Sequence, residues 1–231
     1  PYRLEIKRIG FDLPLLKKIT SQGVPSGVQN SIIAIANVVV QSNINTFGSD
    51  AMAGCGTYAK LEGFVFLPIT AFAMALTTFI GQNLGAGQFD RAKQGARIGI
   101  LCSMAMAELI GVALFFLAPY AMRLFNDDPA VVAIGVRQSH IEALFFCFLA
   151  FAHGVSAVLR GAGRAMVPMV VMLSVWCVLR VSILWIAVPI TQSINTVNWV
   201  YPITWSISTV VLLIYYRKSD WLHSFQREKA K

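Results

Sequence analysis

Residues 81–92 read Gly-Gln-Asn-Leu-Gly-Ala-Gly-Gln-Phe-Asp-Arg-Ala and lie between two long apolar segments. A second glycine-rich link, residues 159–164, reads Leu-Arg-Gly-Ala-Gly-Arg and lies between a later pair of apolar segments. Both links place basic residues beside apolar runs that reach the roughly 20 residues needed to cross a bilayer. This pattern predicts a membrane protein of several spans, with the two links at the membrane surface.

Apolar length divides the chain into six expected spans, within a membrane lobe of residues 22–217. The spans are residues 24–47, 57–80, 94–118, 138–159, 165–190 and 199–216. Residues 1–21 form a basic lead segment, which is either an interfacial helix capped by Asp12 or a plain juxtamembrane anchor, and residues 218–231 form a basic tail. Charged residues make up 13% of the chain, whereas a soluble domain has about 25%. We expect an all-α membrane protein.

The basic residues predict the orientation of the spans. Most of the 19 Lys and Arg residues lie in the lead segment, the two glycine-rich links and the tail, which all fall on one side of the membrane. Basic links face the cytoplasm, so we expect both termini there, in a multi-pass protein of the plasma membrane. A nucleic-acid-binding protein would not sort its charge by alternate links, so no nucleic-acid partner is expected. Tyr201 and Trp221 suit an aromatic belt at the membrane surface.

Nothing in the sequence indicates an enzyme, a metal site or a cofactor. The four cysteines lie singly, and the three histidines form no metal-binding pattern. The glycines of residues 81–87 lack the Gly-Lys-Ser/Thr ending of a phosphate-binding loop, and they follow a membrane span rather than a strand. We therefore expect no ATP-driven pump. Energy for transport would come from a gradient of H⁺ or Na⁺.

Four motifs in order carry a family resemblance. They are Gly23-Val24-Pro25-Ser26-Gly27, Asn43-Ile44-Asn45-Thr46-Phe47-Gly48, residues 81–91 and residues 159–163. In order and spacing they resemble the C-terminal half of the multidrug and toxic compound extrusion (MATE) family. The resemblance implies a secondary active transporter with twelve helices in two six-helix lobes, which exports cationic or amphipathic compounds in exchange for H⁺ or Na⁺.

The chain would then be one lobe, and its partner would be a missing N-terminal lobe or a second copy. The other expected partners are a small-molecule substrate and membrane lipid. Two alternatives stay open. One is a flippase for lipid-linked oligosaccharides, whose family shares this architecture, and the other is a half-protein that transports nothing.

Polar residues of the first span indicate a candidate cavity surface. Asn30, Asn37, Gln41 and Asn45 follow one another at spacings of seven, four and four, which places them on one helical face. Such a face either lines an aqueous cavity or makes hydrogen bonds between helices. Asn37 and Gln41 are the preferred cavity residues, and Phe66 is an aromatic candidate that either contacts substrate or faces lipid.

Charged residues inside the spans are the candidates for ion coupling, because each is costly unless it is paired or faces water. Glu62, Glu142 and Arg180 fall at similar depth, where they form either a coupling site or a permanent ion pair. Glu62 is the first choice for coupling and Glu142 the second. Glu108 is a further candidate near the middle of the third span. His153 either shares a proton with a carboxylate or is a core histidine with its hydrogen bonds satisfied, and the core histidine is the preferred interpretation.

Overall fold

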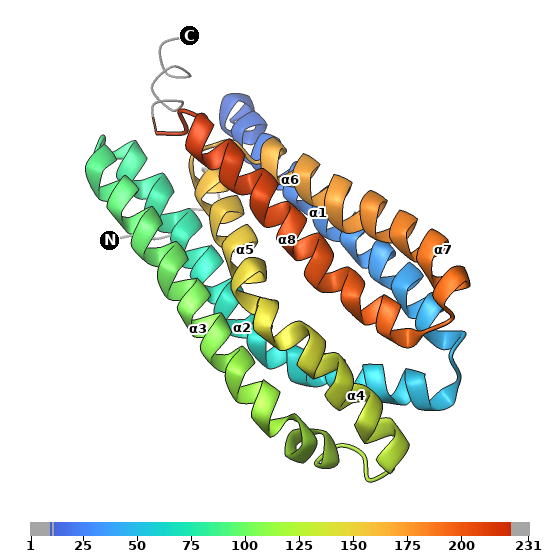
Figure 1. The fold of residues 1–231 in the computed structure, drawn as a ribbon. Helices are drawn as coiled ribbons and strands as arrows, with labels where there is room; N and C mark the ends of the chain where they lie inside the picture. The colour runs from blue at the N-terminus through green and yellow to red at the C-terminus, as the bar shows by residue number, and fades with distance from the viewer. Residues whose placement is uncertain (1–9, 11, 223–231) are drawn as a thin grey trace.

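The computed structural model describes residue 10 and residues 12–222. Within these residues, six helical spans long and apolar enough to cross a membrane follow one another through short links (Figure 1). The fourth span consists of α4, η2 and α5, and the fifth of α6, η3 and α7. The elements are α1 (Leu13–Asn45), α2 (Ser49–Gly85), α3 (Phe89–Arg123), α4 (Pro129–Glu142), η2 (Ala143–Phe145), α5 (Phe146–Gly161), α6 (Met166–Met172), η3 (Leu173–Leu179), α7 (Arg180–Thr191) and α8 (Ile194–Lys218).

The fourth span lies at the centre of the bundle. It packs with α2 and α3 on one side, and α8 packs along it on the other. Beyond α8 lie α1 and the fifth span (Figure 1). The largest apolar core forms around α5, where Phe146, Leu149 and Val155 are fully buried. No residue of α5 is exposed, so a polar group that it carries needs a partner.

The two glycine-rich links end their helices in the same way. Gly87 (φ +71°) and Gly163 (φ +81°) adopt the left-handed conformation that glycine enters at little cost. In each link the residue after the glycine donates its N–H to the carbonyl five positions earlier, at 2.8 Å. These are the features of a Schellman cap, which satisfies carbonyls at a helix end. Both links lie at the same end of the bundle (Figure 1).

Helix α1 differs from the expected boundary between a lead segment and a first span. Asp12 caps it as anticipated, because its Oδ1 accepts a hydrogen bond of 3.0 Å from the Leu15 N–H. The helix then continues without interruption through Pro25 to Asn45. No break in the helix separates residues 13–21 of the expected lead segment from the first span, since a membrane helix tolerates an internal proline. Residues 1–9 and 11 lie outside the described residues.

Two spans depart locally from α-helical geometry. In the fourth span, η2 is a 3₁₀ turn that begins directly after Glu142. In the fifth span, η3 is a seven-residue π-helix that ends directly before Arg180. Short 3₁₀ and π segments within helices often occur at functional sites. Both breaks here adjoin a charged residue inside a span.

Candidate functional site

Glu142 is the most deeply buried of the candidate carboxylates. Its side chain has no exposed surface and lies at the end of α4. The Tyr58 hydroxyl donates a hydrogen bond of 3.2 Å to Oε2, and the Gln138 amide donates one of 2.9 Å to Oε1. Both partners are themselves buried. The carboxylate is therefore held in place by two helices, α2 and α4.

Glu62 and Arg180 join this carboxylate to form what we call the charged cluster: Glu62, Glu142 and Arg180. Glu62 lies one turn after Tyr58 on α2 and is partly buried. Arg180 is 3% exposed, and its charge acts electrostatically on both carboxylates. The structure thus brings together the three residues that the sequence placed at similar depth.

Arg180 is held mainly by neutral groups. Its Nη2 donates a hydrogen bond of 2.8 Å to the Thr204 hydroxyl on α8. The guanidinium carbon lies 4.5 Å from the centre of the Tyr201 ring, within the range of a cation–π contact. Its Nε is buried without a hydrogen-bond partner among the described residues. Tyr201 therefore lies in the site, whereas the sequence placed it in a surface belt, because spacing alone does not show which side of α8 meets α7.

The charge balance of the cluster determines its chemistry. Two ionised carboxylates and one guanidinium leave one negative charge uncompensated inside the bundle. A net charge in a poorly solvated site is costly, and binding a counter-ion or a proton relieves that cost. Carboxylate and hydroxyl oxygens are the ligands that hard cations prefer. The cluster is thus suited to take up one proton or one monovalent cation.

Glu108 lies outside the charged cluster. It is partly buried on α3, and its Oε2 accepts a hydrogen bond of 3.0 Å from the backbone N–H of Cys147. Close by, α3 approaches the turn so tightly that a Cβ on Gly111 would lie 2.3 Å from the carbonyl oxygen of Ala143. Glu108 therefore binds backbone next to η2, the turn that follows Glu142. This hydrogen bond indicates that Glu108 stabilises the backbone next to the 3₁₀ turn of the fourth span.

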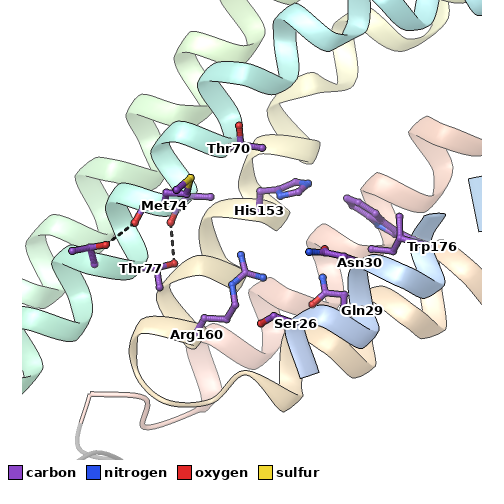
Figure 2. Close-up of a pocket in the computed structure, with 12 residues that line it drawn as sticks. Ser26, Gln29, Asn30, Thr70, Met74, Thr77, His153, Arg160 and Trp176 are labelled. Carbon is purple, nitrogen blue, oxygen red and sulfur yellow. Dashed lines mark hydrogen bonds between the residues drawn. The ribbon is translucent and has the colours of Figure 1, made fainter. Parts of the chain in front are cut away.

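A separate cavity of about 530 Å³ lies between α1, α2, α5 and η3, and we call it the Arg160 cavity (Figure 2). Its polar wall includes Gln29, Asn30, His153 and Arg160, and its aromatic wall is Trp176. Arg160 lies near the end of α5 that joins the second glycine-rich link, and its guanidinium extends toward His153 (Figure 2). From sequence this arginine belonged to the cytoplasmic link.

The candidates of the first span separate into two groups. Asn30 lines the Arg160 cavity, whereas Asn37 and Gln41 are exposed on α1 and are not among its lining residues. Gln41 donates a hydrogen bond of 3.0 Å to Asn45 on the same helix. Phe66 is partly buried and does not line the cavity, but its ring meets His153 edge-on at 6.0 Å.

His153 contradicts the expectation of a satisfied core histidine. Its ring lies 5.5 Å from the Trp176 ring, and its Nε2 is buried without a hydrogen-bond partner in the described part of the chain. The histidine packs against aromatic rings, which offer it no strong acceptor. An unsatisfied nitrogen beside a cavity is a group available to a ligand.

Sequence reasoning did not single out Tyr58, Gln138 or Thr204. Two of these carried a usable signal. Tyr58 lies four residues before Glu62, and Gln138 lies four residues before Glu142. Residues four apart share a helix face, so a polar group one turn from an intramembrane carboxylate is a candidate partner. Thr204 carried no such signal, because it meets Arg180 from another helix.

Comparison with known proteins decides the family. The model of the MatE family matches residues 25–186, which is more than half of the chain. The chain belongs to the MATE family. Members of this family are transporters rather than enzymes, and they cross the membrane several times. The resemblance drawn from the glycine-rich links is thereby confirmed.

Three similar proteins illustrate the match. The chain is 25% identical to the probable multidrug resistance protein YoeA of Bacillus subtilis, covering 90% of this chain and 45% of that protein. It is 30% identical to a FAD transporter of Shewanella oneidensis, covering 55% of this chain and 29% of that protein. The solved structure of the MATE transporter ClbM in complex with Rb⁺ superposes with a TM-score of 0.85 at 22% identity, covering 94% of this chain and 50% of that one.

These matches define the extent of the MATE fold present here. The chain spans about half the length of the relatives that it matches over most of its own length. It therefore corresponds to one six-helix lobe of a two-lobe fold, as the resemblance implied.

Proposed function

We propose that this chain forms one lobe of an exporter that moves small organic compounds, of cationic or amphipathic type, out of the cell in exchange for H⁺ or Na⁺. The charged cluster is the observation that carries the proposal. It places two carboxylates and one guanidinium inside a bundle of membrane-spanning helices, so that ionisation of both carboxylates leaves one negative charge for a proton or a cation to compensate. Polar and ionisable groups at such depth typically belong to ion or proton pathways.

Ion binding would act on transport by favouring one conformation. A ligand shifts an equilibrium only by its difference in affinity between two states. The cluster draws Glu62 from α2, Glu142 from α4 and Arg180 from α7. Small movements between these helices change the distances between the carboxylates and the guanidinium, so the affinity for an ion changes with conformation. The 3₁₀ turn after Glu142 and the π-helix before Arg180 are local breaks at which such movement is possible.

The transport pathway would lie between this lobe and a second one, either an N-terminal lobe or another copy. Transporters built from repeated halves bind substrate at the interface between them. Asn37 and Gln41 are exposed on α1 and supply hydrogen-bonding groups for such an interface. With the basic links in the cytoplasm, both termini would lie on the inner side of the plasma membrane.

Transport by the protein that contains this chain, reconstituted in liposomes, tests the proposal. Efflux of a fluorescent cationic dye is measured with a proton gradient or with a sodium gradient. We expect Glu142→Gln and Glu62→Gln to abolish the part of dye efflux that depends on the ion gradient, since an amide neither releases a proton nor carries negative charge. Asp90→Asn removes an exposed carboxylate outside the cluster and serves as the control. Full gradient-dependent efflux by both Gln variants would disprove ion coupling at the cluster.

Loss of both variants from the membrane would have another meaning. It would show that the cluster fixes helix packing, because each Gln substitution removes electrostatic contacts with the other members of the cluster. In that case Arg180→Leu combined with both Gln substitutions, which leaves no charge in the cluster, should restore part of the membrane-inserted protein. Immunoblots of membrane fractions separate this outcome from loss of coupling.

A further inference from the structure

The Arg160 cavity contains a cation without a counter-ion. Arg160 is partly buried and makes no hydrogen bond or ion pair within the described part of the chain. The described residues that line the cavity include no Asp or Glu. A guanidinium that has lost part of its water without gaining a carboxylate is costly. An anionic ligand would remove that cost.

Other hydrogen-bonding groups of the cavity wall are also unoccupied. Gln29 is only 5% exposed and has no hydrogen-bond partner among the described residues. The Nε2 of His153 is buried and likewise unpartnered. By contrast, the hydroxyls of Thr70, Thr77 and Thr78 donate to backbone carbonyls of their own or a neighbouring helix. The unpartnered groups of the cavity wall come from α1 and α5 and converge in Figure 2. They are the Arg160 guanidinium, the His153 imidazole, and the side-chain amides of Gln29 and of the exposed Asn30.

The number of donors distinguishes a phosphate from a carboxylate. The Arg160 fork, the amides of Gln29 and Asn30, and an imidazole N–H of His153 together exceed what two carboxylate oxygens accept comfortably. A phosphate monoester presents three terminal oxygens and up to two negative charges, and arginine binds it with two parallel hydrogen bonds.

The size and the aromatic wall indicate an organic group as well. The volume of about 530 Å³ lies within the range of small-molecule sites, about 300–1,000 Å³, and is far larger than one phosphate needs. Trp176, Ile33 and Met74 provide an aromatic and apolar surface beside the polar wall. Trp176 belongs to the π-helix η3, a geometry often found at functional sites.

We propose that the Arg160 cavity binds an organic phosphate, with the phosphate against Arg160 and the organic group against Trp176. The site is separate from the charged cluster and does not depend on ion coupling there. Two sources share this chemistry: a soluble phosphate monoester, or the phosphate head of a membrane lipid that reaches the cavity between helices.

Binding of 4-methylumbelliferyl phosphate to the purified protein tests the proposal by fluorescence anisotropy. The protein is held in nanodiscs of phosphatidylcholine, and the phosphate-free probe is 7-methoxy-4-methylcoumarin. We expect Arg160→Gln to weaken binding of the phosphate probe about tenfold or more, because a charge-assisted hydrogen bond is lost. Arg160→Lys should retain part of the affinity, since it keeps the charge without the fork. Arg97→Gln removes an exposed cation on α3 and should leave binding unchanged.

The phosphate-free coumarin should bind more weakly than the phosphate probe, and equally to the parent protein and to Arg160→Gln. Failure of the parent protein to bind the phosphate probe, or equal affinity in Arg160→Gln, would overturn the proposal. A monodisperse gel-filtration peak of Arg160→Lys, with affinity between that of the parent and that of Arg160→Gln, excludes misfolding as the cause of weaker binding.

The source of the phosphate is resolved by adding phosphatidic acid to the nanodiscs. Competition with 4-methylumbelliferyl phosphate in the parent protein supports the proposal and assigns the site to a lipid head group. Unchanged affinity, with the dependence on Arg160 retained, supports the proposal and assigns the site to a soluble organic phosphate.

Discussion

The guanidinium of Arg180 lies 5.6 Å from the centre of the Trp176 ring, and this contact joins the two polar regions of the lobe. Arg180 belongs to the charged cluster, while Trp176 forms a wall of the Arg160 cavity. The two residues lie about one helical turn apart on the fifth span, Trp176 within η3 and Arg180 at the start of α7. A shift of the π-helix η3 would therefore move a side chain of the Arg160 cavity and a side chain of the charged cluster together.

This contact predicts a measurable coupling between the two side chains. Arg180→Met and Trp176→Leu should each destabilise the protein, and together they should destabilise it less than the sum of the single effects. The difference should be about 0.5–2 kcal/mol, the strength of a cation–π contact. Free energies of unfolding from denaturant titration in mixed micelles provide the measurement. If the double variant loses the sum of the two single effects, the Trp176 ring and the Arg180 guanidinium do not stabilise each other.

Glu108 should act through hydrogen bonding rather than through charge. Glu108→Gln retains an oxygen that accepts from the Cys147 N–H, so we expect near-normal stability and gradient-dependent efflux. Glu108→Leu leaves that N–H unsatisfied next to η2 and should cost about 1–3 kcal/mol. Thermal unfolding and liposome efflux of the two variants provide the test. Loss of coupling in a stable Glu108→Gln protein would instead place Glu108 in the ion pathway.

The apolar runs were sufficient to predict the six spans, because the thickness of a bilayer sets their length. They were not sufficient to predict where helices depart from α-geometry. Gly111 and Glu108 of another helix contact the backbone at and beside the 3₁₀ turn after Glu142, and no local sequence signal marks the turn. The continuity of the lead segment with the first span was not predicted for a related reason, since Pro25 is accommodated inside α1.

The charged cluster could be anticipated in part, because charged residues within apolar spans are rare and their depths can be compared. The Arg160 cavity could not. Its arginine lies in a glycine-rich link of the sequence, where basic residues normally reach the membrane surface. Whether such a side chain turns inward depends on how α1 packs against the rest of the bundle, and spacing within α5 does not show this.

The glycines of the first link should differ sharply in their tolerance of substitution. Gly87 has φ +71°, so Gly87→Ala should destabilise the protein by about 1–2 kcal/mol, the cost of a left-handed conformation for an L-residue. Gly85 lies in α2 with open space around it, and Gly85→Ala should be neutral or slightly stabilising. Thermal unfolding of the two variants in detergent provides the comparison. Equal effects would show that the left-handed conformation at residue 87 costs an L-residue nothing.

Labelling of the links tests the orientation that the basic residues predict. Gln88 and Gln192 are exposed in links at opposite ends of the bundle (Figure 1). In a background where the four native cysteines are replaced by serine, Gln192→Cys should react with a membrane-impermeant maleimide on intact cells. Gln88→Cys should react only after the cells are permeabilised, because the basic link that holds it stays in the cytoplasm during insertion. The reverse pattern would place the Arg160 cavity near the outer surface, where cytoplasmic organic phosphates could not reach it directly.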